Sequence, residues 1–469
     1  MLGENGAGKT TLMNILTGLY RADEGEILID GKPVHFTSAK DAIHAGIGMV
    51  HQHFMLVPVF TVAENVVLGA EPTGALDRLD MEKARAEVRA ISAEHGLEVD
   101  PDALIEELPV GIQQRVEIIK VLFRSADVLI FDEPTAVLTP QEVEEFFEIV
   151  RSLRDAGKAL VFITHKLNEV LEVADRISVL RGGKIVGERD PKSATDAELA
   201  EMMVGRAVRF EVEKAPAKPG AALLEVKGLR VIRDRAHTAV SDVSFSIRDG
   251  EVVGIAGVQG NGQTELVEAI TGLRLPAGGT IAFHGQDITK ASSRERHRLG
   301  MAHIPEDRRL SGIIGEFNIA ENMILDSYYD DRFSSAVTLR WPDVYKATVE
   351  NVAAFDVRTP SIFNLAQTLS GGNQQKLVVA RELSRDIKLL VAAQPTRGLD
   401  VGSIEYIHKR IVEARDKGVG VLIVSTELDE IVALSDRILV MYRGRIVAEF
   451  AAGEAEIAKI GLAMAGAAA

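Results

Sequence analysis

The sequence contains no cysteine, which excludes disulfides, thiolate metal sites and cysteine nucleophiles together. It also lacks long apolar runs. The longest, such as Ala159–Ile163 and Leu389–Ala393, fall far short of the roughly 18 residues that a membrane-spanning helix needs. Positive charge is in deficit, because 53 lysines and arginines face 69 aspartates and glutamates, for a formal net charge of −16. A chain this acidic is not expected to bind nucleic acid through its overall field, so any phosphate must be bound by a local site.

The sequence does contain an internal repeat. Two stretches of the 469 residues resemble one another, first at an offset of 254 residues and later at an offset of 261. The aligned pairs are 3–19 with 257–273, 108–118 with 369–379, 132–139 with 393–400, and 174–186 with 435–447. A short stretch with two prolines separates the copies. We therefore expect a first domain over 1–211, a linker over 212–222 and a second domain over 223–469.

Short β-branched runs alternate with amphipathic stretches in both copies. Val128–Phe131, Leu160–Thr164 and Val252–Ala256 are typical of buried strands, whereas Gln141–Ala156 and Ile404–Lys417 are typical of helices. This alternation predicts an α/β fold in which each copy is a mostly parallel sheet covered by helices.

The first copy opens with Gly-Glu-Asn-Gly-Ala-Gly-Lys-Thr, which fits the phosphate-loop pattern G-x-x-x-x-G-K-[ST] in full. Glycines let backbone N–H groups turn towards phosphate oxygens, and the positive end of the next helix points at the same anion. Lys9 is expected to neutralise phosphate charge and the Thr10 hydroxyl to bind Mg²⁺. The alternative is a glycine-rich turn with a lysine nearby. The candidate nucleotide-binding residues are Gly3, Asn5, Gly6, Ala7, Gly8, Lys9, Thr10 and Thr11.

Two acidic residues end the strand that begins at Val128. On their own, Asp132 and Glu133 would be solvated carboxylates at a strand end. After a phosphate loop in an α/β sheet they indicate more specific roles. Asp132 would hold the water shell of Mg²⁺, and Glu133 would polarise the attacking water as a general base.

With these motifs, the sequence resembles the ATP-binding-cassette (ABC) ATPases over nearly its full length, which implies ATP and Mg²⁺ as ligands. Gln52 falls at the position of the family's Q-loop, implied to sense the γ-phosphate and Mg²⁺. His165, 32 residues after Glu133, falls at the switch-histidine position, which implies contact with the γ-phosphate. His51 and His53 resemble a metal-binding pair, but flanking side chains are the simpler interpretation.

The second copy has lost most of these groups. Its replacements are Gln263 for Lys9, Glu306 for Gln52, Ala393 for Asp132, Gln394 for Glu133 and Thr426 for His165. Yet it keeps Leu-Ser-Gly-Gly-Asn at 369–373, close to the family signature LSGGQ, where the first copy has proline at position 109. Proline removes both the serine hydroxyl and an N–H donor.

ABC domains resemble one another in pairing head to tail, with ATP held between one phosphate loop and the partner's signature. The resemblance therefore implies one complete site, in which Ser370, Gly371 and Gly372 of the second copy complete the first copy's loop. Every defect falls in the other composite site. That site is expected not to hydrolyse ATP, although its loop amides and the helix N-terminus at Thr264 remain for binding.

The resemblance narrows to the tandem ATPases of simple-sugar and nucleoside importers. The second copy carries Ile-Pro-Glu-Asp-Arg at 304–308 and Gln-Pro-Thr-Arg-Gly-Leu-Asp at 394–400, and residues 51–58 and 108–114 favour the nucleoside branch. It implies permease subunits on separate membrane-spanning chains, docked on helical insertions at about 64–125 and 320–385. It also implies an extracytoplasmic substrate-binding protein, a peripheral place at the cytoplasmic face of the membrane, and no nucleic acid.

Two alternatives stay open. A soluble tandem ABC protein acting on ribosomes or DNA would resemble a family with a long charged linker and two competent sites, which this chain lacks. A weakly active or inactive remnant is suggested by the start of the first copy. Only Met1 and Leu2 precede its loop, whereas 34 residues from Leu223 precede Gly257. We therefore expect about 32 residues to be missing, among them the strand before the loop and an adenine-stacking aromatic. A misassigned start codon explains this more economically than decay.

Overall fold

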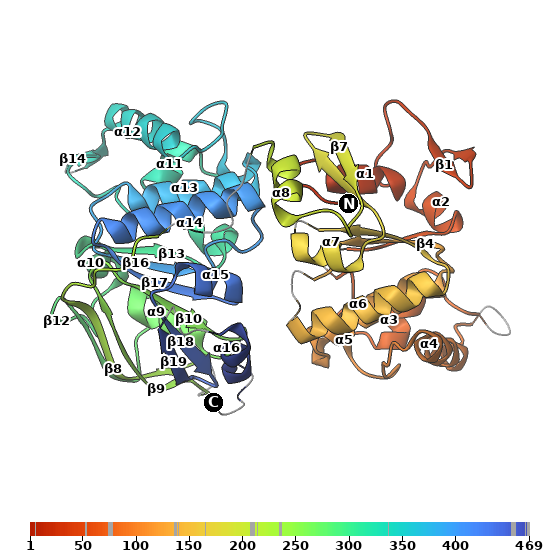
Figure 1. Cartoon of the computed structure of the whole chain (residues 1–469), viewed down its shortest axis with the longest axis horizontal. Helices are drawn as coiled ribbons and strands as arrows, with labels where there is room; N and C mark the ends of the chain where they lie inside the picture. Colours follow the sequence, from red (N-terminus) through yellow and green to blue (C-terminus); the bar gives the residue numbers. More distant parts are fainter. Residues whose placement is uncertain are drawn as a thin grey trace. The chain divides into compact units, whose positions relative to one another are not determined.

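The computed structural model describes residues 1–4, 6–51, 54–73, 78–135, 138, 140–164, 166–206, 212, 214–233, 237–335, 337–451, 456–464 and 466. The chain divides into two compact units, Met1–Val208 and Arg209–Ala469 (Figure 1). Both units alternate strands and helices, so the predicted α/β fold is confirmed.

Unit 1 contains eight α-helices and seven strands among its described residues. Its helices are α1 (Lys9–Leu16), α2 (Ala39–His44), α3 (Val62–Val67), α4 (Met81–His95), α5 (Val110–Phe123), α6 (Pro140–Asp155), α7 (Leu167–Val173) and α8 (Asp196–Val204). Its strands are β1 (Ile27–Ile29), β2 (Lys32–Val34), β3 (Ile47–Val50), β4 (Val128–Asp132), β5 (Ala159–Ile163), β6 (Ile177–Arg181) and β7 (Lys184–Arg189).

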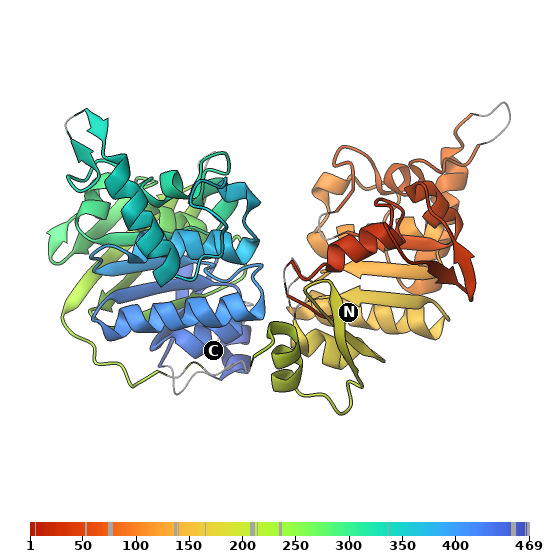
Figure 2. The same ribbon diagram turned by 90° about the horizontal axis from the view of Figure 1, so that it is seen from above.

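The sheet of unit 1 is built on parallel strands in the order β3-β4-β5. The hairpin β6–β7 is antiparallel, and α8 packs against β6 (Figure 2). Leu2 joins the two pieces, because it forms parallel bridges to Thr164 on one side and to Val179 on the other. Its side chain is fully buried, so this junction lies in the core.

Unit 2 follows the same plan with more strands. Its helices are α9 (Gln263–Thr271), α10 (Ser293–Arg298), α11 (Ile319–Met323), α12 (Trp341–Ala354), α13 (Gly371–Leu383), α14 (Val401–Asp416), α15 (Leu428–Leu434) and α16 (Ile457–Met464). Its strands are β8 (Ala222–Ile232), β9 (Thr238–Arg248), β10 (Val252–Ala256), β11 (Gly278–Phe283), β12 (Gln286–Asp287), β13 (Met301–Ile304), β14 (Ser334–Ser335), β15 (Thr338–Leu339), β16 (Leu389–Ala393), β17 (Gly420–Ser425), β18 (Arg437–Tyr442) and β19 (Arg445–Ala451).

The main sheet of unit 2 has the order β13-β16-β17-β10-β18-β19, and all pairs except β18–β19 are parallel. In its centre, Ala256 pairs with Ser425 and Val440. These are the repeat equivalents of Leu2, Thr164 and Val179, so both copies share one register at this point. Alternate residues of the strands point into two separate cores, as a sheet buried on both faces requires.

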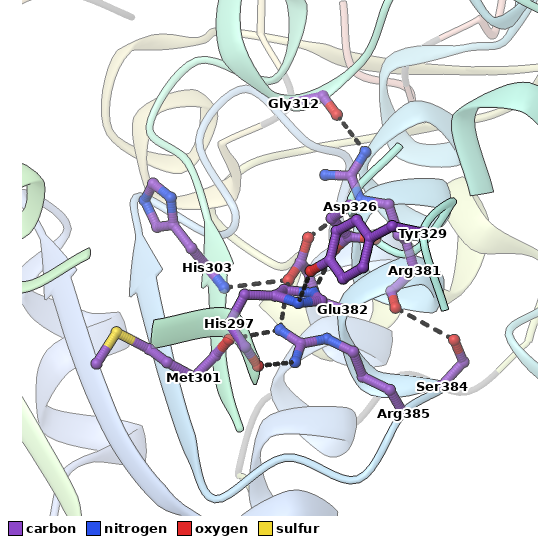
Figure 3. Close-up of polar contacts among 10 residues, drawn as sticks. All are labelled: His297, Met301, His303, Gly312, Asp326, Tyr329, Arg381, Glu382, Ser384 and Arg385. Atoms are coloured by element: carbon purple, nitrogen blue, oxygen red, sulfur yellow. Dashed lines mark hydrogen bonds and ion pairs between the residues drawn. The ribbon is translucent and has the colours of Figure 1, made fainter. Parts of the chain in front are cut away.

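A buried ionic network holds α13 against the sheet of unit 2 (Figure 3). Arg385 donates to the backbone oxygen of Met301, and its Nη2 lies 3.5 Å from Oε2 of Glu382. Glu382 also accepts from the N–H of His303 at 3.2 Å, and Nε of Arg381 lies 3.1 Å from its Oε1. Burial raises the pKa of the Glu382 carboxyl, while both arginines oppose the rise.

Arg296 links α10 to the end of α9 and to the segment before α10, through hydrogen bonds to backbone oxygens. It is 1% exposed, and its Nη1 donates to the carbonyls of Ala269 and Ile270 in the last turn of α9, both at 2.6 Å. Its other nitrogens bond the segment before α10, at Ile288 and Ala291. The bonds to Ala269 and Ile270 are buried, and loss of the hydrogen-bond partner of a buried carbonyl is costly.

We expect Arg296→Met to destabilise unit 2 by roughly 3 kcal/mol, because it leaves buried carbonyls unsatisfied. The chain has one tryptophan, Trp341, and it lies in unit 2, so its fluorescence during urea unfolding reports this unit. Arg298→Met, on the exposed side of the same helix, is the control and should change the midpoint little. Equal midpoints for the two variants would contradict this role of Arg296.

Candidate functional site

The glycine-rich loop of unit 1 leads from the junction at Leu2 into α1. Gly8, the residue before the helix, has a φ of 101°, in the left-handed region that glycine adopts readily. No side chain caps the helix, so the first N–H groups of α1 are left for another acceptor. Thr10 and Thr11 are exposed at this end of the helix. Backbone donors and a helix N-terminus of this kind are suited to an anion.

Lys9 lies folded across its own loop. The side chain is 6% exposed, and Nζ donates to the backbone oxygens of Gly3 at 2.6 Å and Glu4 at 3.0 Å. Ala7 is tied to β6 and β7, because its carbonyl accepts from the N–H of Gly183 at 2.8 Å. The loop and its lysine are therefore fixed by backbone hydrogen bonds.

Asp132 and Glu133 lie at the carboxyl end of β4. Asp132 is 8% exposed; burial, followed by repulsion from Glu133, raises the pKa of its carboxyl, and Lys9 and His51 oppose the rise. Glu133 has a φ of 46°, and its N–H donates to the carbonyl of Ile163 at 2.9 Å. The structure thus brings the predicted lysine and both predicted carboxylates to one edge of the sheet.

Three sequence-predicted residues, Asn5, Gln52 and His165, lie outside the described residues, as does His53. Unit 2 describes the equivalents of all three, which are Gln259, Glu306 and Thr426. Thr426, at the position of His165, donates from N and Oγ1 to Oε1 of Gln394, at 3.3 and 3.2 Å. Strand β17 is the equivalent of β5. In unit 2 the residue after this strand, Thr426, therefore lies beside Gln394, which replaces the candidate base Glu133.

The glycine-rich loop of unit 2 has a similar internal hydrogen bond, but Gln263 replaces the charged Lys9. Nε2 of Gln263 donates to the carbonyl of Val258 at 3.0 Å, as Lys9 does to its own loop. The hydroxyl of Thr264 donates to Oε2 of Glu306 at 3.0 Å, and Arg397 lies 3.1 Å from the other oxygen of that carboxylate.

The signature segments differ at the start of α5 and α13. Ser370 caps α13, with its hydroxyl oxygen accepting from Nδ2 of Asn373 at 3.0 Å and from the backbone N–H of the same residue. Gly372 is buried, and a Cβ there would come within 2.3 Å of the Ser403 hydroxyl, which would have to move to admit it. In unit 1, Pro109 precedes α5 and provides no side-chain cap.

The sequence motifs do not include one buried carboxylate near the site. Glu169 on α7 is 6% exposed and accepts hydrogen bonds from Thr135 and Thr164. The repeat contains a signal for it, because α7 (LNEVLEV) and α15 (LDEIVAL) both have glutamate at their third position.

Unit 1 also has a groove of about 290 Å³ between α2, β3 and α5. Ile43, Met49 and Met55 are among its apolar lining, and Lys120 and Glu117 among its polar lining. Burial lowers the pKa of Lys120, while Glu117 opposes the shift. At the equivalent positions, unit 2 has members of the ionic network of Figure 3: His297, His303 and Arg381 replace Ile43, Met49 and Lys120.

Comparison with known proteins identifies the family. The family model described as "ABC transporter" matches residues 1–136 and 240–397. The chain belongs to this family.

Relatives of this ABC chain match it over nearly its whole length. The guanosine import ATP-binding protein NupO of Bacillus subtilis (strain 168) is 49% identical over 466 residues, 99% of this chain and 91% of that protein. The nucleoside import ATP-binding protein NupA of Lactococcus lactis subsp. cremoris is 50% identical over 446 residues, 95% and 88% of the two chains. The ribose import ATP-binding protein RbsA 1 of Rubrobacter xylanophilus is 42% identical over 469 residues, 99% and 92%.

The predicted resemblance to the ATP-binding proteins of nucleoside and sugar importers is thus confirmed, and the chain is an ATP-binding transport ATPase of the ABC type. Within the part of the chain that the structure describes, no helix is both long and apolar enough to cross a membrane.

We expect Lys9→Ala to weaken ATP binding by about tenfold or more, because a charge-assisted contact to phosphate is lost. Titration of the full chain with a fluorescent ATP analogue measures the dissociation constant. Gln263→Ala in the second loop removes no charge and is the matched control. An unchanged affinity for the Lys9 variant would show that this loop does not hold the phosphates.

Proposed function

We propose that this chain is the ATP-hydrolysing energy-coupling subunit of an importer for nucleosides or simple sugars, with one hydrolytic site per chain. The site combines the loop and carboxylates of unit 1 with Ser370, Gly371 and Gly372 of unit 2. The observation that carries the proposal is the division of groups between the units. Unit 1 has Lys9 and the two acids at one sheet edge, whereas unit 2 has the serine-capped signature helix.

The donor set at the edge of unit 1 fits Mg²⁺, which prefers oxygen ligands. The Thr10 hydroxyl is exposed beside the loop, and Asp132 provides a carboxylate whose raised pKa a neighbouring cation would lower again. With Gln52, these residues would hold the ion. When bound, Mg²⁺ neutralises charge on the phosphate oxygens.

In the proposed mechanism, residues of unit 1 bind the phosphates and accept the proton of the attacking water. Lys9 exchanges its bonds to Gly3 and Glu4 for phosphate oxygens, while the N–H groups of α1 orient the same anion. Glu133 accepts a proton from the attacking water, and its left-handed backbone and bonded N–H fix its direction. His165 contacts the γ-phosphate in this scheme.

Partners of this subunit would be permease chains and, in the same system, an extracytoplasmic substrate-binding protein. The groove beside Met55 is the permease docking site that we propose in unit 1, since its lining joins apolar side chains to the charged side chains of Lys120 and Arg124. The subunit would then lie at the cytoplasmic face of the membrane. The net charge of −16 argues against nucleic acid as a partner. The named relatives favour nucleosides as the cargo.

Glu133→Gln should lower ATP hydrolysis by the assembled complex by about 100-fold or more, because the general base is lost. Gln394→Glu, the reverse change at the equivalent position of unit 2, should leave the rate nearly unchanged. Phosphate release by the purified complex measures both. Equal sensitivity of the rate to the two changes would contradict a single hydrolytic site.

Met55→Asp should weaken co-purification with the permease chains while ATP binding by the isolated chain stays normal, because a charge enters an apolar part of the groove. Met55 is 62% exposed, so the change does not disturb the core. Val59→Asp is the control, since Val59 is 66% exposed and does not line the groove. Equal recovery of permease with both variants would exclude the groove as the docking site.

A further inference from the structure

The carboxylate of Glu169 connects the ends of two neighbouring strands of unit 1. Oε1 accepts from the hydroxyl of Thr135 at 2.6 Å, and Oε2 accepts from the hydroxyl of Thr164 at 3.0 Å. The two threonines are 2% and 1% exposed. A buried carboxylate costs desolvation free energy unless its oxygens are bonded, and here both are.

Each threonine lies within two positions, in the sequence, of a residue of the proposed hydrolytic site. Thr135 lies two residues after Glu133, in the turn that leaves β4. Thr164 directly follows β5 and precedes position 165 in the sequence, and its hydroxyl also accepts from the N–H of Lys166 at 3.0 Å. Glu169 therefore ties the turn that carries the proposed base to the backbone that flanks the proposed γ-phosphate contact.

The equivalent carboxylate of unit 2 makes a different set of bonds. Oε1 of Glu430 accepts from Thr396 at 2.7 Å and lies 3.0 Å from Nε2 of His408, where unit 1 has Phe147. Among the residues described, its Oε2 is buried without a hydrogen-bond partner. Ser425, the equivalent of Thr164, accepts from the N–H of Glu427. Of the two strand ends in unit 2, the carboxylate thus bonds only the turn after β16, and the end of β17 is tied to that turn by Thr426, which donates to Gln394.

We infer that Glu169 is a positioning residue for ATP hydrolysis, which fixes the distance between the turn of Glu133 and the end of β5. The inference rests on the proposed function. The hydroxyl-to-carboxylate bonds to both strand ends occur in unit 1, which carries the proposed base, whereas Glu430 of unit 2 bonds Thr396 and His408 instead. Small misplacement of a catalytic group lowers the rate of the chemical step far more than the affinity for substrate.

The test measures ATP hydrolysis by the full chain assembled with its permease chains. Three variants separate an effect on the placement of catalytic groups from an effect on folding. Thr164→Val removes one hydroxyl at nearly constant volume and should lower kcat by about tenfold or more, with KM for ATP and the dissociation constant of a fluorescent ATP analogue almost unchanged. Thr164→Ser restores the hydroxyl and should restore most of kcat. Glu169→Met removes both bonds and should lower kcat at least as much as Thr164→Val.

Glu430→Met in unit 2 is the matched control and should leave kcat nearly at the wild-type value. Wild-type kcat in both Thr164→Val and Glu169→Met, or an equal loss in Glu430→Met, overturns the inference. The variant Glu133→Gln separates this outcome from failure of the proposed function. If Glu133→Gln hydrolyses ATP normally, the single-site function fails; if it is inactive while Thr164→Val and Glu169→Met are normal, only the role of Glu169 fails.

Discussion

Parallel hydrogen bonding between β3, β4 and β5 is the constraint on which the site of unit 1 depends. Strands that run in one direction bring their carboxyl ends to one edge of the sheet, so Asp132 and Glu133 arrive beside Thr164. The bridges of Leu2 bring the glycine-rich loop to the same edge. Backbone pairing, rather than contacts between the polar side chains, therefore assembles the chemical groups.

The second unit shows that this assembly survives the loss of its chemistry. Gln394 has a φ of 48°, against 46° for Glu133, and its N–H bonds the neighbouring strand in the same way. Gln263 keeps a hydrogen bond that Lys9 makes in the first loop. Because such substitutions remove charge and keep hydrogen bonds, unit 2 retains the backbone geometry of unit 1 at both positions.

The repeat made much of this arrangement predictable from the sequence. Matching the copies at fixed offsets assigned equivalent positions correctly, as the shared register of Leu2 and Ala256 shows. The predicted helix positions were close to those observed. The helix expected over Gln141–Ala156 spans Pro140–Asp155, and α14, which is capped by Asp400, begins at Val401, three residues before the predicted start at Ile404. Cap geometry of this kind is invisible to hydrophobic periodicity, which records only the buried face.

The buried polar residues could not be predicted from the sequence alone. Arg296 and Glu169 lie in helices of only six and seven residues, which are too short to show a clear hydrophobic period. Their partners include the backbone oxygen of Ala269 and the hydroxyl of Thr135, which are 27 and 34 residues away in sequence. The groove of unit 1 and the ionic network of unit 2 depend on three segments that meet only in the folded chain. Motif matching reads local spacing, so such long-range contacts escape it.

The lysine that lies across its own loop has a consequence for selectivity among anions. Nζ of Lys9 is already bonded to Gly3 and Glu4, so an incoming anion competes with two carbonyls for it. In the proposed site, a triphosphate that also reached the N–H groups of α1 would gain more contacts in exchange for these two bonds than a lone inorganic phosphate would. The bonded lysine would then favour the polyanion over inorganic phosphate, a product of its hydrolysis.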